Sequence, residues 1–186
     1  MKYPANVFAI WLTGMPCSGK TTISYALQKE LNFFGIDASV LDGDVLRKEI
    51  SKDLGYSRQD RETHISRVTD LAESLQRRGT PVIVALISPY AQMRAWARDR
   101  LSGFIEVYLR CPLHVCEARD VKGMYRLARE RKIAQFTGIS DVYEEPAAPE
   151  LALDTDRTGV DSCVASILDV LTQTEYQYGT QSRGAP

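Results

Sequence analysis

The sequence lacks the features that mark several large classes of protein. It has two histidines and four cysteines, and no C-x-x-C pair, so no spacing typical of a zinc site is present. Its 23 basic and 24 acidic residues leave a net charge of −1, without the positive field that general nucleic-acid binding needs. Its longest apolar runs, such as Pro81 to Ile87, are too short to span a bilayer, and the N-terminus has no signal-peptide pattern. We therefore expect a cytoplasmic protein with reduced thiols that binds neither nucleic acid nor membrane.

Short apolar runs alternate with helical patterns along the 186 residues. The runs predicted to be strands are Val7 to Thr13, Ser39 to Leu41, Pro81 to Ile87, Phe104 to Leu109 and Leu151 to Leu153. Apolar spacings of three and four predict helices that include Ile23 to Leu31, Ile65 to Leu75 and Val164 to Leu171. This alternation predicts a three-layer α/β fold with a central parallel sheet and helices on both faces.

Two segments depart from this alternation. Residues 119–137 hold few residues that fit the pattern of a core and many cations, which predicts a mobile basic lid. Residues 176–186 lack periodicity, so we expect a disordered C-terminal tail. We therefore expect one domain over residues 1–175.

A glycine-rich loop follows the first predicted strand and precedes a helix. Gly14 and Gly19 have no Cβ to block a backbone that wraps a polyanion, and the helix N-terminus adds positive potential. Lys20 can reach the outer phosphates and the Thr21 hydroxyl can hold Mg²⁺. We predict an ATP-phosphate site made of Gly14, Met15, Pro16, Cys17, Ser18, Gly19, Lys20, Thr21 and Thr22.

Two carboxylates end the second predicted strand, at Asp42 and Asp44. Ligands of open α/β sheets bind at this carboxyl edge. Asp44 is our candidate for Mg²⁺ and for the attacking hydroxyl, whereas Asp42 is expected only to shape the turn. A solvated Asp-Gly turn is the alternative for both residues.

Cationic and aromatic residues follow these carboxylates. Ser57 to Asp60 resembles a capping box, which places Arg61 and His64 in the first turns of a helix. With Arg47 they suggest an anionic acceptor, because an arginine fork matches sulfate or phosphate. Surface salt bridges are the alternative for the arginines. Tyr56 and Phe136 could stack on a purine or pack in a small core.

Taken together, several separated motifs resemble the adenylyl-sulfate kinase family. They span about Trp11 to Thr155 and are Trp11-Leu12-Thr13-Gly14 with the phosphate loop, Leu41-Asp42-Gly43-Asp44 with Arg47, Leu54-Gly55-Tyr56-Ser57 with Asp60-Arg61, Ile87-Ser88-Pro89-Tyr90 with Arg94, Glu106-Val107-Tyr108, Cys116 to Tyr125, Phe136-Thr137-Gly138-Ile139 and Tyr143-Glu144-Glu145-Pro146. The resemblance implies a P-loop kinase that, with Mg²⁺, transfers the ATP γ-phosphate to the ribose 3′-hydroxyl of adenylyl sulfate, yielding 3′-phosphoadenylyl sulfate in sulfate activation. It also implies a homodimer.

The resemblance also implies roles for individual residues. Asp44, Lys20 and Ser88 would be catalytic, the serine as a phosphorylated intermediate described for some members, and Thr21 and Asp44 would hold the metal. Tyr56 and Phe136 would sandwich the acceptor adenine. The substrate-binding set would be Asp44, Arg47, Tyr56, Arg61, His64, Ile87, Ser88, Pro89, Lys122 and Phe136. Ser88 could instead simply line the pocket beside Pro89.

The chain departs from the family pattern at four places. Met15 to Ser18 replaces a Leu-Ser-Gly type loop interior, Val45 and His64 stand where asparagine is usual, and residues 129–133 lose a glycine and gain cations. A thiol at Cys17, near a helix N-terminus, could have a lowered pKa. Two alternatives stay open: a kinase of another small hydroxyl compound such as a sugar derivative, and a nucleotide-binding regulatory module without catalysis.

Overall fold

The structure is a computed structural model that describes residues 7–181, with side chains described for residues 7–173. Five strands form one parallel sheet in the order β2-β3-β1-β4-β5. The strands are β1 (Ala9–Thr13), β2 (Ser39–Asp42), β3 (Val82–Ala85), β4 (Phe104–Arg110) and β5 (Leu151–Asp154). The helices are α1 (Lys20–Phe33), α2 (Gly43–Glu49), α3 (Arg58–Arg77), α4 (Ala91–Arg100), α5 (Leu113–Arg119), α6 (Met124–Arg129) and α7 (Val160–Gln181).

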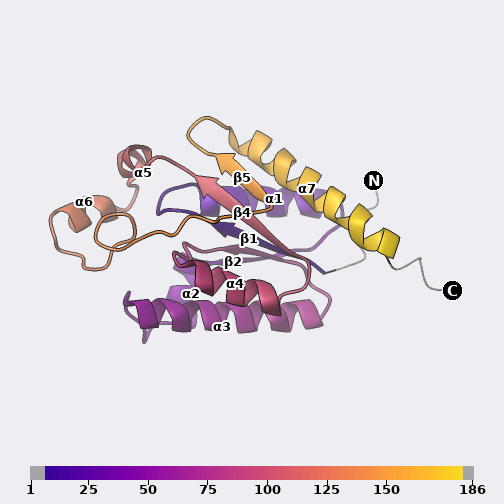
Figure 1. Ribbon diagram of the computed structural model, residues 1–186, viewed down its shortest axis with the longest axis horizontal. Helices are drawn as coiled ribbons and strands as arrows, with labels where there is room; N and C mark the ends of the chain where they lie inside the picture. The colour runs from indigo at the N-terminus through magenta and orange to yellow at the C-terminus, as the bar shows by residue number, and fades with distance from the viewer. Residues whose placement is uncertain (1–6, 182–186) are drawn as a thin grey trace.

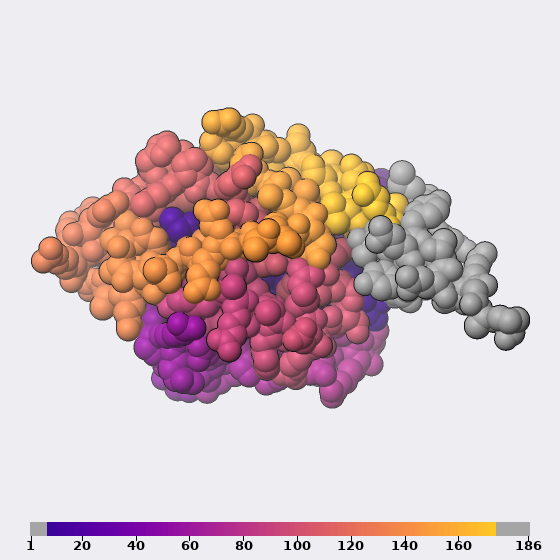
Figure 2. All heavy atoms as spheres, in the orientation of Figure 1, coloured from indigo at the N-terminus to yellow at the C-terminus, as the bar shows by residue number. Residues whose placement is uncertain are grey.

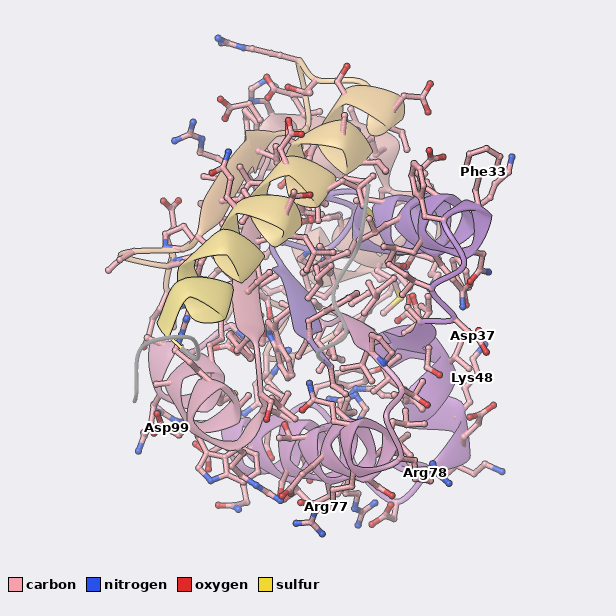
Figure 3. All side chains as sticks on the ribbon, turned by 90° about the vertical axis from the view of Figure 1, so that its right-hand side faces the viewer. Phe33, Asp37, Lys48, Arg77, Arg78 and Asp99 are labelled. Atoms are coloured by element: carbon pink, nitrogen blue, oxygen red, sulfur yellow. The ribbon has the colours of Figure 1, made fainter. Side chains whose placement is uncertain are left out.

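Helices cover both faces of the sheet, as the alternation predicts (Figures 1 and 3). Alternate residues of each strand point to opposite faces, so Ile10 packs with α1 and α7, whereas Trp11 packs with α3 and α4. Both side chains are fully buried, which is expected for a parallel sheet covered on two sides. The predicted three-layer fold is confirmed.

The long helices begin and end close to their sequence signals. Ser57 and Asp60 form the predicted capping box at the start of α3, and that helix ends at Arg77. The final helix differs, because α7 continues to Gln181, six residues into the segment for which we expected disorder. Because α7 already packs on α1, adding residues to its end requires no new helix nucleation. The helix can therefore continue beyond the residues that show the apolar periodicity. Residues 182–186 of that tail lie outside the described residues, and the domain boundary at 175 stays a prediction.

The predicted lid has its own small core. Tyr125, Ala128 and Phe136 are 2%, 4% and 9% exposed and pack with Cys111 and Cys116 beyond the end of β4. The expectation that residues 119–137 contribute little to a core is therefore wrong. The error arose because these apolar residues are unevenly spaced and lie on a short helix and irregular backbone, so they show no periodicity. The lid's mobility stays a prediction.

Candidate active site

The glycine-rich loop lies between β1 and α1, at the carboxyl edge of the sheet. A Cβ on Gly14 would meet the Leu109 carbonyl oxygen at 2.6 Å, so only glycine fits there. Cys17 has φ 61, a left-handed conformation that is unfavourable for a residue with a side chain. Pro16 lacks an N–H, but its carbonyl accepts a hydrogen bond at 3.0 Å from the Tyr125 hydroxyl. The backbone of the loop can therefore approach a ligand closely, and a hydrogen bond connects the lid to the loop.

Lys20 is the first residue of α1, and its side chain reaches back to this loop. Its Nζ donates to the carbonyl oxygens of Gly14 (2.9 Å) and Met15 (2.7 Å). Loss of hydration on burial lowers the pKa of Lys20 to about 8, although neighbouring acidic groups partly offset this. Burial also raises the pKa of the Cys17 thiol, so the expectation of a lowered pKa there is wrong: loss of hydration outweighs the nearby lysines. The ammonium of Lys20 is therefore held where an anionic phosphate could replace the carbonyls.

Asp42 connects the glycine-rich loop to the second strand. One oxygen, Oδ2, accepts a hydrogen bond at 2.7 Å from the Thr21 hydroxyl, and the other accepts from the Asp44 and Val45 amides as the N-cap of α2. The carboxylate is buried, with 4% of Asp42 exposed. Our expectation that Asp42 only shapes a turn is therefore too narrow. The strand-Asp-helix pattern itself, which is typical of an N-cap, could have revealed this role.

Asp44 lies two residues further on, in the first turn of α2. Its side chain is 67% exposed and forms an ion pair with Lys122 of the lid, which is 63% exposed. The structure thus brings together two predicted site residues that are 78 positions apart. An exposed ion pair of this kind contributes little to stability, so a competing ligand can replace it at small cost.

Three of the predicted acceptor residues meet beside α3. The Arg47 guanidinium lies 4.6 Å from the centre of the Tyr56 ring and donates to the Gly55 carbonyl at 2.7 Å. Arg61 is 6% exposed and donates to the carbonyls of Tyr56 (2.9 Å) and Gln135 (2.5 Å). Arg61 therefore links the α3 side of the site to the lid. Arg47 stays partly accessible at the surface.

Sequence reasoning missed a carboxylate in this region. Asp141 lies 3.6 Å from Arg61 Nε and accepts hydrogen bonds at 2.8 and 2.9 Å from the Tyr90 hydroxyl. No local pattern marks Asp141, because its partners come from distant parts of the chain. The segment that follows the lid is therefore held by the helices on the acceptor side.

Two further residues that were predicted to bind the acceptor, His64 and Phe136, are buried, whereas a side chain that contacts a ligand is expected to be accessible. His64 is 4% exposed, and its Nδ1 lies 2.9 Å from the Ser51 hydroxyl. Burial, with Arg47 and Arg67 nearby, lowers the pKa of His64 to about 4, so the ring is neutral at pH 7. Phe136 packs edge-on against Tyr125, with 4.9 Å between ring centres. The packing alternative therefore describes Phe136 in this structure.

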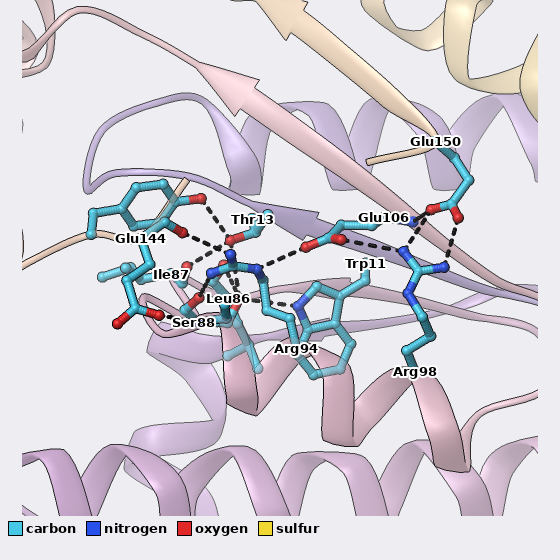
Figure 4. Close-up of polar contacts among 12 residues, drawn as sticks. Trp11, Thr13, Leu86, Ile87, Ser88, Arg94, Arg98, Glu106, Glu144 and Glu150 are labelled. Atoms are coloured by element: carbon cyan, nitrogen blue, oxygen red, sulfur yellow. Dashed lines mark hydrogen bonds and ion pairs between the residues drawn. The ribbon is translucent and has the colours of Figure 1, made fainter. Parts of the chain in front are cut away.

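The loop after β3 holds Ile87, Ser88 and Pro89. The Ser88 hydroxyl accepts from Trp11 Nε1 (3.0 Å) and donates to Thr13 Oγ1 (3.1 Å), and Ser88 is 2% exposed (Figure 4). Its φ of 38 is unfavourable for a residue with a side chain. The hydroxyl thus both donates and accepts hydrogen bonds inside the fold, and this geometry favours the pocket-lining alternative over a phosphorylated serine.

A hollow of about 530 Å³ lies beside Met15 and is lined otherwise by residues 138–143 and 145. Figure 2 shows indigo atoms from the N-terminal part of the chain framed by orange atoms of the region around the lid. A Cβ on Gly138 would meet the Met15 side chain at 2.5 Å, so the segment after the lid passes close to the phosphate loop. Donor and acceptor elements therefore converge at one end of the molecule.

Comparisons with known proteins agree with this geometry. The family model for adenylylsulphate kinase matches residues 6–154. This chain belongs to that family. The adenylyl-sulfate kinase of Rippkaea orientalis is 44% identical over 167 residues, covering 90% of this chain and 92% of its own. A probable adenylyl-sulfate kinase of Synechocystis is 45% identical over 170 residues, covering 91% and 96%.

A solved structure supports the family assignment at the level of the fold. The APS kinase CysC of Mycobacterium tuberculosis, in complex with AMPPNP and APS, superposes with a TM-score of 0.86 at 39% identity. The match covers 91% of this chain and 99% of the CysC chain. In the part of this chain that the structure describes, no helix is long and apolar enough to cross a membrane.

Proposed function

We propose that this protein is an adenylyl-sulfate kinase that transfers the ATP γ-phosphate to the ribose 3′-hydroxyl of adenylyl sulfate, forming 3′-phosphoadenylyl sulfate. The observation that carries the proposal is the convergence of a phosphate loop, through Asp42 and Asp44, with Arg47 and Arg61 at one edge of the sheet. The family assignment supports this acceptor over a sugar derivative. The retained Lys20, Thr21 and Asp44 argue against a regulatory module without catalysis.

The residues around Thr21 fit a magnesium ion bound with ATP. Mg²⁺ prefers oxygen ligands and is usually held by one or two carboxylates together with substrate phosphates. The Thr21 hydroxyl contacts Asp42, and Asp44 follows on the same helix start. The ion would neutralise charge on the phosphates.

The chain's own residues would act mainly by positioning. Phosphoryl transfer gains most from orientation and charge neutralisation. Lys20 would bind the outer phosphates, and Asp44, once released from Lys122, would orient the acceptor hydroxyl. Arg47 would bind the acceptor's anion directly, whereas Arg61 would hold the lid over it. Transfer would be direct, because the Ser88 hydroxyl is buried.

The test measures ADP release from magnesium-ATP with a panel of acceptors that contains adenylyl sulfate, adenosine monophosphate and common sugars. We expect turnover with adenylyl sulfate. Turnover only with a sugar would refute the proposal. In the variants Arg47→Gln and Arg61→Gln, the acceptor KM should increase much more than the ATP KM, and equal increases would refute the acceptor-side assignment.

We also propose that the chain forms a homodimer and works in the cytoplasm. The family resemblance supports the dimer. Light scattering during size-exclusion chromatography should give twice the chain mass of 20.8 kDa. A mass equal to one chain at micromolar concentration would refute the dimer.

A further inference from the structure

Arg94 and Glu106 form a buried ion pair below the predicted acceptor loop. Arg94 on α4 is 3% exposed, and Glu106 in β4 is 7% exposed. Arg94 Nε lies 2.8 Å from Glu106 Oε1 (Figure 4). Removing two charges from water is costly, and their attraction repays it only when further hydrogen bonds satisfy both groups. The other hydrogen bonds that Arg94 donates therefore identify the parts of the chain that the ion pair holds in place.

The other donors of Arg94 bind two backbone carbonyls that are far apart in the chain. Arg94 Nη1 donates to the Ser88 carbonyl at 2.7 Å, and Nη2 donates to the Glu144 carbonyl at 2.7 Å. The guanidinium is planar, so its three contacts are fixed relative to one another. One side chain thus fixes the loop after β3 to the segment after the lid.

The loop at Ser88 needs such support. Its positive φ is unfavourable and persists only where the surroundings hold the backbone in place. The Glu144 amide donates to the Pro89 carbonyl at 2.8 Å, and the Glu144 carboxylate accepts from the Ala91 amide at 2.7 Å. Arg94 therefore completes a set of bonds that joins the two segments directly.

Both segments adjoin the acceptor side. β3 pairs with β2, so the loop that follows β3 lies beside the end of β2, where Asp42 stands. The segment after the lid carries Asp141, which contacts Arg61. We propose that Arg94, held by Glu106, is a positioning residue for the acceptor, fixing the Ile87–Pro89 loop relative to residues 141–145. This inference rests on the proposed function only for the identity of the acceptor.

Arg98 provides a matched control on the same helix. It contacts the other oxygen of Glu106 at 3.2 Å and pairs with Glu150 at 2.6 Å, but it is 35% exposed. In the part of the chain that the structure describes, its recorded polar contacts reach neither Ser88 nor Glu144. A lysine at position 98 thus disturbs the same carboxylate without touching the two segments.

The kinetic test compares Arg94→Lys with Arg98→Lys. A lysine keeps the charge beside Glu106 but cannot reach both carbonyls with a planar fork. Arg94→Lys should raise the acceptor KM about tenfold or more and lower kcat, with an ATP KM within about twofold of wild type. Arg98→Lys should leave all three within about twofold. Equal increases in both KM values, or a lower unfolding temperature with unchanged kinetics, would overturn the proposal.

Hydrogen exchange tests the positioning role without relying on catalysis. In the free protein, Arg94→Lys should speed amide exchange in residues 86–91 and 142–145 together, and Arg98→Lys should not. Glu106→Gln, which leaves the arginine fork intact but removes its counter-charge, should speed exchange in the same two segments. Unchanged exchange in both variants, or a change in only one segment, would refute the coupling. Failure of the wild type to use adenylyl sulfate would refute the proposed function alone, because the exchange result stands independently.

Discussion

Raising the pH from 7 to 8.5 should make ATP binding take up a proton at Lys20. In the free protein, burial lowers the pKa of this ammonium to about 8. Its contacts there are neutral carbonyl oxygens of Gly14 and Met15, which replace only part of the lost hydration. A bound triphosphate places negative charge beside Nζ and favours the protonated form, so the pKa of Lys20 should rise on binding.

The size of the effect follows from the fraction of neutral lysine in the free protein. With a pKa of about 8, about 0.1 of Lys20 is neutral at pH 7 and about 0.75 at pH 8.5. If bound Lys20 stays charged, binding takes up about 0.1 and about 0.75 protons at these two pH values. Above pH 8, the apparent Kd should increase with pH and approach about tenfold per unit.

Calorimetry of magnesium-ATP binding in buffers with different ionisation enthalpies measures this uptake directly. Lys20→Arg is the matched control, because arginine stays charged over this range and should show no uptake between pH 7 and 8.5. An NMR titration of the Lys20 side chain in the free protein gives the pKa independently of binding. A pKa near 10.5, with no uptake at pH 8.5, would refute the reasoning and show that the carbonyls fully replace water.

Three further predictions concern residues around the same loop. Asp44→Ala should lower kcat by roughly two to four powers of ten. It should change the free energy of unfolding by less than about 0.5 kcal/mol, because the side chain is exposed. Near wild-type turnover would exclude a catalytic role. Asp42→Ala should lower the free energy of unfolding by about 1–2 kcal/mol, measured in urea, because the carboxylate caps α2 and binds Thr21; an unchanged midpoint would contradict the capping role. Cys17→Gly should raise the free energy of unfolding by about 1 kcal/mol and Cys17→Ala should not, because only glycine relieves the left-handed φ; equal stabilities would show that no strain is stored there.

The parts of the fold that sequence predicts well are those with local causes. The run before Gly14 is buried on both faces, and the capping box at Ser57 fixes the start of α3 within a few residues. Each of these signals lies next to the element it specifies. The parallel sheet and its covering by helices on both faces then follow from the alternation of strands and helices, whereas that alternation does not fix the order of the strands.

The parts that sequence does not predict depend on contacts between distant residues. Nothing near Ser88 shows that its hydroxyl is taken by Trp11, 77 positions away. Phe136 and Tyr125 meet in a lid where Arg131 and Gln135, which lie between them, have left-handed backbone conformations that neither residue type signals. The role of Asp42 falls between these cases, because its cap is local but its bond to Thr21 is not.

The contacts that join donor and acceptor elements are of two physical kinds. Thr13, which ends β1 just before the phosphate loop, donates to the Ile87 carbonyl at 2.8 Å and accepts from Ser88, and these neutral bonds are removed from solvent. The link between Lys122 and Asp44 is charged and exposed, and salt and competing phosphates weaken such pairs. The buried bonds therefore keep the two loops in a fixed relation, and we expect substrate to replace the exposed lid contact. A P-loop kinase that aligns two substrates needs this division, since positioning supplies most of its rate enhancement.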